Sequence, residues 1–281
     1  MCMLAVVLAL CASLSVGTGD FLAGSQARRT SLWAVIVVSQ ITGLVWTGAL
    51  VAARGHGLPM GELWAATGAG VTAAAGIALG YKALTIGIMG IVGPIISLSV
   101  AVPLAVGLAR GERPSAYQLG GIVIALAGVV LAARQKSAGR RHQAASRLSV
   151  VLALATAAIV GVNMLFYASA AKHDPYWGIF IARATSAAIF AAAFAIMRPR
   201  TRLTRAAIIP LIAVGVLDTG ANGLFSVAST YGYLSVVSVL SSVFPIFTVI
   251  LAYVFLNERL SRTQQFGVAA ALVGVGFIAA G

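Results

Sequence analysis

The sequence predicts an all-α integral membrane protein, in which ten transmembrane helices form two inverted five-helix repeats. Three observations predict this fold class. Of the 281 residues, 60% are hydrophobic and only 9% are Asp, Glu, Lys or Arg, against about 25% in an ordinary soluble domain. Ten long apolar segments follow one another, and a motif near the middle of the chain recurs near its end at a constant spacing. The composition alone excludes a soluble enzyme, a disordered chain and a secreted disulfide scaffold.

The apolar segments are long enough to cross a bilayer one after another, because a transmembrane helix needs about 20 apolar residues. Eight of the ten segments contain no charged residue, whereas the seventh contains only Arg183 and the eighth only Asp218. The connections between them leave no room for a second, soluble domain. The predicted spans are residues 1–19, 31–53, 63–81, 83–109, 114–133, 148–171, 175–197, 206–231, 232–257 and 263–281.

The first span has two interpretations, a cleaved signal peptide or a retained helix, and we favour the retained helix. The segment lacks the basic stretch with which signal peptides begin. It also runs into Gly17, Gly19 and Asp20 instead of a small-residue cleavage site. We expect Asp20 to lie at the end of this span.

The net charge of +13 predicts membrane orientation and not nucleic-acid binding. The basic residues form short clusters between the spans, and such clusters face the cytoplasm. The loops after spans 1, 3, 5, 7 and 9 hold 14 Lys and Arg residues, and those after spans 2, 4, 6 and 8 hold 4. This count predicts that both termini lie outside the cytoplasm.

A repeat relates the two halves of the chain. Residues 112–128 and 258–274 share Glu-Arg, a Gln and two glycines, all at a spacing of 146 residues. We therefore expect a first repeat over residues 1–134, a basic connecting loop over 135–147 and a second repeat over 148–281. Each repeat has five spans, so the second enters the membrane with the opposite orientation. Inverted repeats are typical of secondary transporters, which bind their substrate between the two repeats.

The motif itself resembles the EamA family of the drug/metabolite transporter superfamily. A proline-bearing span is followed by Gly111–Arg113 and Gln118–Gly121, and again by Asn257–Arg259 and Gln264–Gly267. Gly17–Gly24 and Tyr81–Leu84, which leads into Ile91–Pro94, resemble one bacterial branch of that family. The resemblance implies a multi-pass transporter of the cell (inner/plasma) membrane. It also implies cytoplasmic termini, in conflict with the charge count.

Charged and amide side chains inside the spans are the first candidates for a substrate site, because they are costly in a bilayer. Asp218 and Asn222 are four residues apart and share a helix face. They could bind a proton or a substrate amine, or form a structural hydrogen bond with a neighbouring helix. Arg183 could bind a substrate carboxylate or form a buried pair with Asp218. Gln40 occupies the matching place in the first repeat.

Further candidates lie at helix ends and near prolines. Asp20 could belong to the site or lie at the membrane interface. Asn163 lies close to the position in the second repeat that matches Asp20. Pro94, Pro103 and Pro245 should interrupt two spans and so line a cavity, together with Ser97 and Ser241. Tyr81 and Phe225 could line it or fill the core. For the repeated Glu112 and Glu258 we expect a capping role, and for Gly120, Gly121, Gly128, Gly267, Gly274 and Gly276 close helix packing.

These features favour a secondary transporter that exports a small metabolite, such as an amino acid, by alternating access, with proton coupling as an option. The alternative is an efflux transporter for multiple drugs or cationic compounds, which Arg183 argues against. A membrane-embedded enzyme is least favoured, because the sequence has no H-E-x-x-H or G-x-S-x-G motif. We expect no cofactor and no metal. The expected partners are a small-molecule substrate, the lipid bilayer and protons, without nucleic acid, for a monomer or homodimer.

Overall fold

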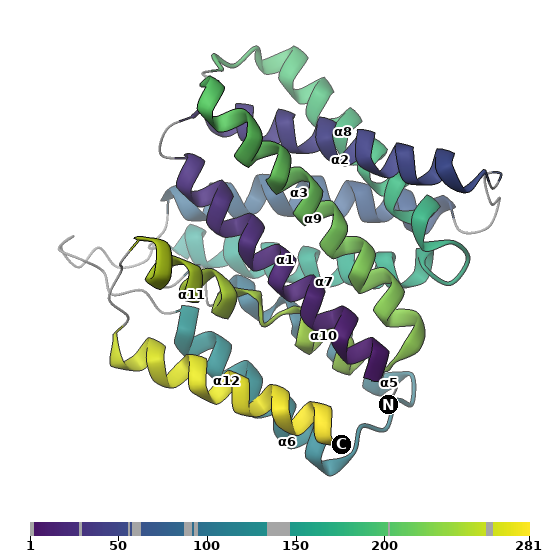
Figure 1. The fold of residues 1–281 in the computed structure, drawn as a ribbon, viewed down its shortest axis with the longest axis vertical. Helices are drawn as coiled ribbons and strands as arrows, with labels where there is room; N and C mark the ends of the chain where they lie inside the picture. Colours follow the sequence, from purple (N-terminus) through teal and green to yellow (C-terminus); the bar gives the residue numbers. More distant parts are fainter. Residues whose placement is uncertain are drawn as a thin grey trace.

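The computed structural model describes residues 3–27, 30–55, 57, 63–86, 92, 95–133, 147–201, 203–256 and 261–281. All regular elements in these residues are helical (Figure 1). In chain order they are α1 (Met3–Ala27), α2 (Leu32–Arg54), α3 (Leu63–Ile86), the 3₁₀ turn η1 (Leu98–Val100), α5 (Ala101–Ala109), α6 (Ala116–Ala133), α7 (Arg147–Ala170), α8 (Pro175–Met197), α9 (Arg205–Tyr231), α10 (Leu234–Ser241), α11 (Phe244–Leu256) and α12 (Arg262–Ala280).

Eight helical stretches in the described residues are long and apolar enough to cross a membrane. They fall within or beside eight of the ten predicted spans. The fourth and fifth predicted spans correspond to two shorter apolar helices, Ile95–Ala109 and Ala116–Ala132. Starts and ends are set by local chemistry. Asp174, for example, caps α8 by accepting hydrogen bonds from the backbone nitrogens of Tyr176 and Trp177.

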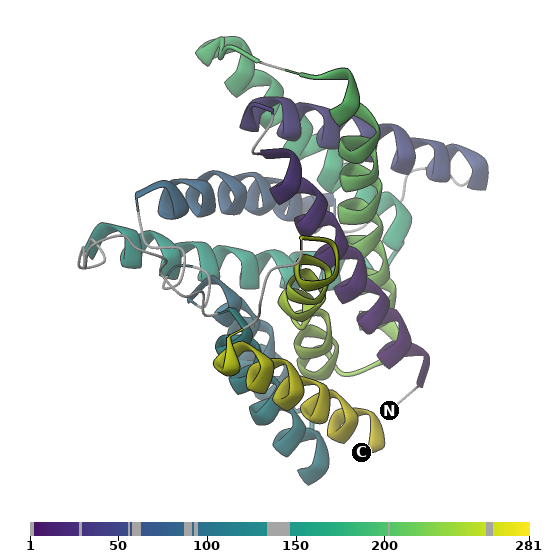
Figure 2. The same ribbon diagram turned by 60° about the vertical axis from the view of Figure 1, so that its left-hand side comes forward.

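The helices pack across the two halves of the chain. The α1 helix lies along α9, α3 lies along α7, and α6 lies along α12. The α2 helix contacts α8 and α9, and α3 also contacts α8. Figure 2 shows α3 and α7 extending together to one side of the molecule and α6 and α12 forming a separate pair. The largest buried apolar cluster lies between these groups, with members from α1, α7, α9 and α10.

Glycines allow the closest of these contacts. A side chain at Gly128 of α6 would lie 2.7 Å from the backbone oxygen of Gly267 in α12, and one at Gly121 would lie 2.7 Å from that of Gly274. These four glycines therefore have the packing role expected of them. Gly120 and Gly276 do not, because nothing lies within 4 Å of a side chain placed there. Both glycines therefore lie on helix faces that do not form the α6–α12 contact.

Two predicted spans are interrupted close to prolines. The 3₁₀ turn η1 precedes α5, in which Pro103 is the third residue. The α10 helix ends at Ser241 and α11 begins at Phe244, with Pro245 as its second residue. Proline has no N–H to donate and fits the first turn of a helix. Pro103 therefore follows a 3₁₀ turn and Pro245 follows the end of α10, whereas Pro94 lies outside the described residues.

A carboxylate caps the start of α10. The two oxygens of Glu112 accept hydrogen bonds from the backbone nitrogens of Leu234, at 2.8 Å, and Ser235, at 2.9 Å. The negative charge also suits the positive end of the helix dipole. Glu112 therefore has the predicted capping role, and it joins the loop after α5 to the second half of the chain. Glu258 lies outside the described residues.

The expectation that Asp20 ends the first span is wrong. The α1 helix continues from Met3 to Ala27. Phe21, Leu22 and Ala23 prolong its apolar sequence, and no proline interrupts it. Asp20 is therefore in the body of the helix, where its side chain faces other helices.

Candidate functional site

A cavity of about 370 Å³ lies among the helices and collects most of the predicted polar residues. Its volume falls within the range of about 300–1,000 Å³ that is usual for small-molecule sites. Helices α1, α2, α3, α7, α8 and α9 contribute to its wall, together with Ile96 from the segment before η1. The predicted residues that line it are Asp20, Gln40, Tyr81, Asn163, Arg183, Asp218 and Asn222.

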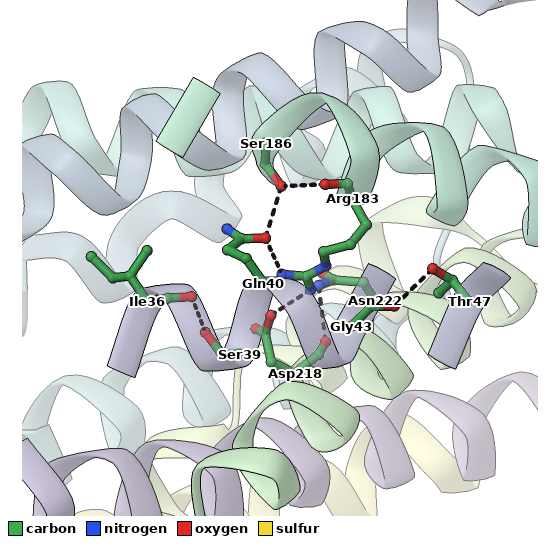
Figure 3. A network of polar contacts seen from close by, with 9 residues as sticks. All are labelled: Ile36, Ser39, Gln40, Gly43, Thr47, Arg183, Ser186, Asp218 and Asn222. Carbon is green, nitrogen blue, oxygen red and sulfur yellow. Dashed lines mark hydrogen bonds and ion pairs between the residues drawn. The ribbon is translucent and has the colours of Figure 1, made fainter. Parts of the chain in front are cut away.

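Arg183 and Asp218 form an ion pair at one wall of the cavity (Figure 3). A terminal guanidinium nitrogen of Arg183 donates to Oδ2 of Asp218 at 2.6 Å. The two side chains differ in exposure, at 7% for Arg183 and 50% for Asp218. The pair therefore has a buried cation and a carboxylate that partly faces open space. Of the two interpretations of Arg183, the structure contains the pair with Asp218.

Gln40 holds the other side of the guanidinium. Its Oε1 accepts from the second terminal nitrogen of Arg183 at 3.1 Å and from the hydroxyl of Ser186 at 3.1 Å (Figure 3). Gln40 is itself 4% exposed. The two residues that occupy matching places in the proposed repeats thus meet directly between α2 and α8. Both terminal nitrogens of Arg183 are engaged by protein groups.

Gly43 makes room for this network one helical turn beyond Gln40. A side chain at this position would lie 3.0 Å from Nε of Arg183 and would also collide with the hydroxyl of Thr219. Nε of Arg183 and Oγ1 of Thr219 are buried and have no hydrogen-bond partner in the part of the chain that the structure describes. The absence of a side chain at Gly43 therefore sets how closely α2 approaches the arginine.

The two asparagines use their amide nitrogens within the protein. Nδ2 of Asn163 donates to the backbone oxygen of Ala69 at 2.6 Å and to the hydroxyl of Thr72 at 2.9 Å. Nδ2 of Asn222 donates to the backbone oxygen of Asp218 at 2.9 Å. The oxygen of each side chain remains as an acceptor. Asn163 uses both of its amide hydrogens in these contacts, whereas Asn222 uses one of its two.

Asp20 lines the same cavity without a partner of its own. Its side chain is exposed, and it makes no hydrogen bond or ion pair with the described residues. Tyr81, which is also exposed, lies on another wall of the cavity. Among the described residues of the lining, Asp20 is therefore the charged group that is both exposed and unpaired.

Other predicted residues lie away from the cavity lining. Phe225 is buried in the largest apolar cluster, as its core interpretation predicted. Ser241 is buried near the break between α10 and α11, and its hydroxyl has no hydrogen-bond partner among the described residues. Ser97 is half-buried and does not line the cavity, and neither do Pro103 and Pro245.

Four polar residues of the lining are absent from the sequence-based prediction: Thr72, Thr156, Tyr167 and Ser186. Hydroxyl side chains are common in apolar helices, so they carry no strong signal by themselves. The repeat could have identified Thr72, because Asp218 lies 146 residues after it. Ser186 follows Arg183 by three residues and so shares its helix face.

Comparison with known proteins finds a family model that is similar to the second half of the chain. The model of the EamA-like transporter family matches residues 147–280. No curated protein matches the sequence. One solved crystal structure is similar over 97% of this chain and 95% of its own, with a TM-score of 0.82 and 19% sequence identity. That likeness shows a shared fold over nearly the whole chain.

Proposed function

We propose that the chain, whose residues 147–280 match the model of the EamA-like transporter family, is a secondary transporter that exports a small metabolite through the polar cavity. The family is one of membrane transporters, which accords with the apolar helices and with a multi-pass membrane protein. The observation that carries the proposal is the cavity itself. It brings three charged side chains, from α1, α8 and α9, to one place between apolar helices, and such groups usually mark a substrate or ion pathway.

Reciprocal packing supports transport by two inverted repeats. The first helix of each half lies along the third span of the other, as α1 along α9 and α7 along α3. The second helices, α2 and α8, contact each other, as do α6 and α12. In secondary transporters built in this way, the repeats move against each other around a fixed site. Alternating access is therefore the mechanism that we propose.

Individual contacts repeat at nearly the same spacing. A side chain at Gly70 of α3 would lie 2.5 Å from Thr185 of α8, and one at Gly215 of α9 would lie 2.8 Å from Thr42 of α2. The glycines are 145 residues apart and the threonines 143. The contact between α3 and α8 therefore has a counterpart in the contact between α9 and α2.

An amino acid is the first substrate class to test, and proton coupling is the first energy source. Either carboxylate, Asp20 or Asp218, could carry a proton between the two sides of the membrane. Arg183 is the residue that could bind the carboxylate of an amino acid. Its two terminal nitrogens already donate hydrogen bonds to Gln40 and Asp218. A substrate carboxylate would have to displace one of these partners.

Counterflow in proteoliposomes tests the proposal. Liposomes loaded with one unlabelled amino acid at a time should accumulate the same labelled amino acid when they contain the protein. An imposed proton gradient should increase the rate if transport is proton-coupled. Asp218→Asn and Arg183→Gln should abolish the uptake, whereas Asp174→Asn should preserve it because Asn caps a helix as well as Asp does. Unchanged transport by both cavity variants would show that the cavity is not the pathway.

A further inference from the structure

We propose that the cavity binds organic monocations, such as protonated amines, in preference to zwitterions and anions, with Asp20 as the group that recognises the positive charge. Transport of the bound cation rests on the proposed function, with an organic amine in place of an amino acid as the small metabolite, but the binding preference does not. The preference follows from which charges in the cavity are already neutralised within the protein.

The charges that line the cavity leave one carboxylate in excess. Asp20, Arg183 and Asp218 are the charged residues of the lining. Arg183 and Asp218 are paired at 2.6 Å, so their charges largely cancel for a nearby ligand. Asp20 has no pairing partner among the described residues. A cation that enters the cavity would neutralise this carboxylate, whereas an anion would meet it unshielded.

Arg183 is poorly placed to recognise an anion. Its side chain is 7% exposed, and its terminal nitrogens donate to Gln40 and Asp218. A ligand carboxylate would have to separate a buried ion pair, and removing one partner from such a pair is strongly unfavourable. A zwitterion therefore gains from Asp20 through its ammonium group but finds no free cation for its carboxylate.

Hydrogen-bonding groups around Asp20 also favour a donor ligand. Both hydrogens of the Asn163 amide are used within the protein, which leaves its oxygen. Asp218 is half-exposed and only one of its oxygens accepts from Arg183. An ammonium group has three donors and no acceptor, which matches this lining. The ring of Tyr81, which is exposed and lines the same cavity, adds a face that attracts cations.

Three ligands that share a phenyl ring on a two-carbon chain test the proposal. Phenethylamine, phenylalanine and 3-phenylpropionate are a cation, a zwitterion and an anion at neutral pH. Calorimetric titration of the purified protein in detergent should show that phenethylamine binds at least about tenfold more tightly than the other two, a factor equivalent to ~1.4 kcal/mol. Asp20→Asn should remove most of this preference, and Asp20→Glu should retain it. Asp174→Asn, which removes a carboxylate outside the cavity, should leave it unchanged.

The outcomes separate this inference from the proposed function. Equal binding of the three ligands, tighter binding of phenylalanine, or no binding of phenethylamine would overturn the inference. A preference for phenethylamine that survives in Asp20→Asn would overturn the role of Asp20. Selective binding without counterflow of phenethylamine in proteoliposomes would support the inference and contradict the transport proposal. Counterflow of phenylalanine that does not depend on Asp20 would support transport and contradict the inference.

Discussion

Arg183 and Asp218 form one ion pair but occupy different surroundings. The arginine side chain is 7% exposed and the aspartate side chain 50%. Removal of either partner leaves the other without its counter-ion. The penalty depends on burial, because a charge that can reach water is solvated and a buried charge is not.

We predict that Asp218→Asn destabilises the protein more than Arg183→Gln does. Asp218→Asn leaves a buried guanidinium without a counter-ion, and such a loss costs about 3–5 kcal/mol when both charges are buried. We expect a smaller loss here because Asp218 is partly solvated, and a smaller one still for Arg183→Gln. Thermal unfolding of the detergent-solubilised variants measures both changes. The double variant should recover part of the loss, and equal destabilisation by the two single variants would contradict this account.

At the scale of the element, the α6–α12 contact depends on selected glycines only. A side chain at Gly128 would meet the backbone of α12, with the oxygen of Gly267 at 2.7 Å. Gly120, on the same helix, has nothing within 4 Å of a side chain placed there. Both glycines lie in α6, but only Gly128 faces the backbone of α12.

We predict that Gly128→Val lowers the stability of the protein and that Gly120→Val does not. The added side chain at Gly128 forces α6 and α12 apart, and overpacking of this kind costs about 1–3 kcal/mol. Thermal unfolding in detergent, followed by the fluorescence of the four tryptophans, measures the difference. Equal melting temperatures for the two variants would show that the helices do not approach as closely as described.

The Glu112 cap is a second contact between elements that the chain places far apart. We predict that Glu112→Ala destabilises the protein, because the backbone nitrogens of Leu234 and Ser235 lose charge-assisted acceptors worth about 1.5–3 kcal/mol each. Arg113→Ala in the same loop is the matched control, since Arg113 is exposed. Glu112→Gln, which keeps one acceptor, should fall between them in thermal unfolding. A stability of Glu112→Ala equal to that of Arg113→Ala would contradict the capping role.

At the scale of the whole molecule, membrane orientation is the open prediction. The start of α1 and the end of α12 lie at the same end of the molecule in both views (Figures 1 and 2), which fits an even number of crossings. The excess of basic residues in the loops after odd-numbered spans predicts that this end faces away from the cytoplasm. The resemblance to the EamA family implied the opposite side.

A reporter that is active only in the cytoplasm, fused after Gly281, measures this orientation in intact cells. From the charge count we predict no signal, and the same reporter placed in the 135–147 loop should be active. A full signal from the C-terminal fusion would overturn the prediction and place both termini in the cytoplasm. Expression of each fusion in membranes, measured by immunoblotting, is the control.

The sequence by itself determined the helical class and most of the spans, because burial in a bilayer demands long apolar segments whatever their partners. It also identified all six charged and amide residues that line the cavity, since each stands out in an apolar span. It did not predict that α1 continues beyond Asp20 or that Ser241 lies off the cavity lining. Hydrophobicity has little periodicity when both lipid and protein neighbours are apolar, so it does not show which face of a helix turns inward.

Only the tertiary structure decided which charges are neutralised and which are free. Arg183 and Asp218 are 35 residues apart in sequence, and Arg183 and Gln40 are 143 apart. Their contacts exist because α2, α8 and α9 cross at one place, where Gly43 and Gly215 allow close approach. The same crossing leaves Asp20 unpaired in the cavity. Charge in the sequence is a property of single residues, whereas the charge presented to a ligand depends on which partners the fold brings within hydrogen-bonding distance.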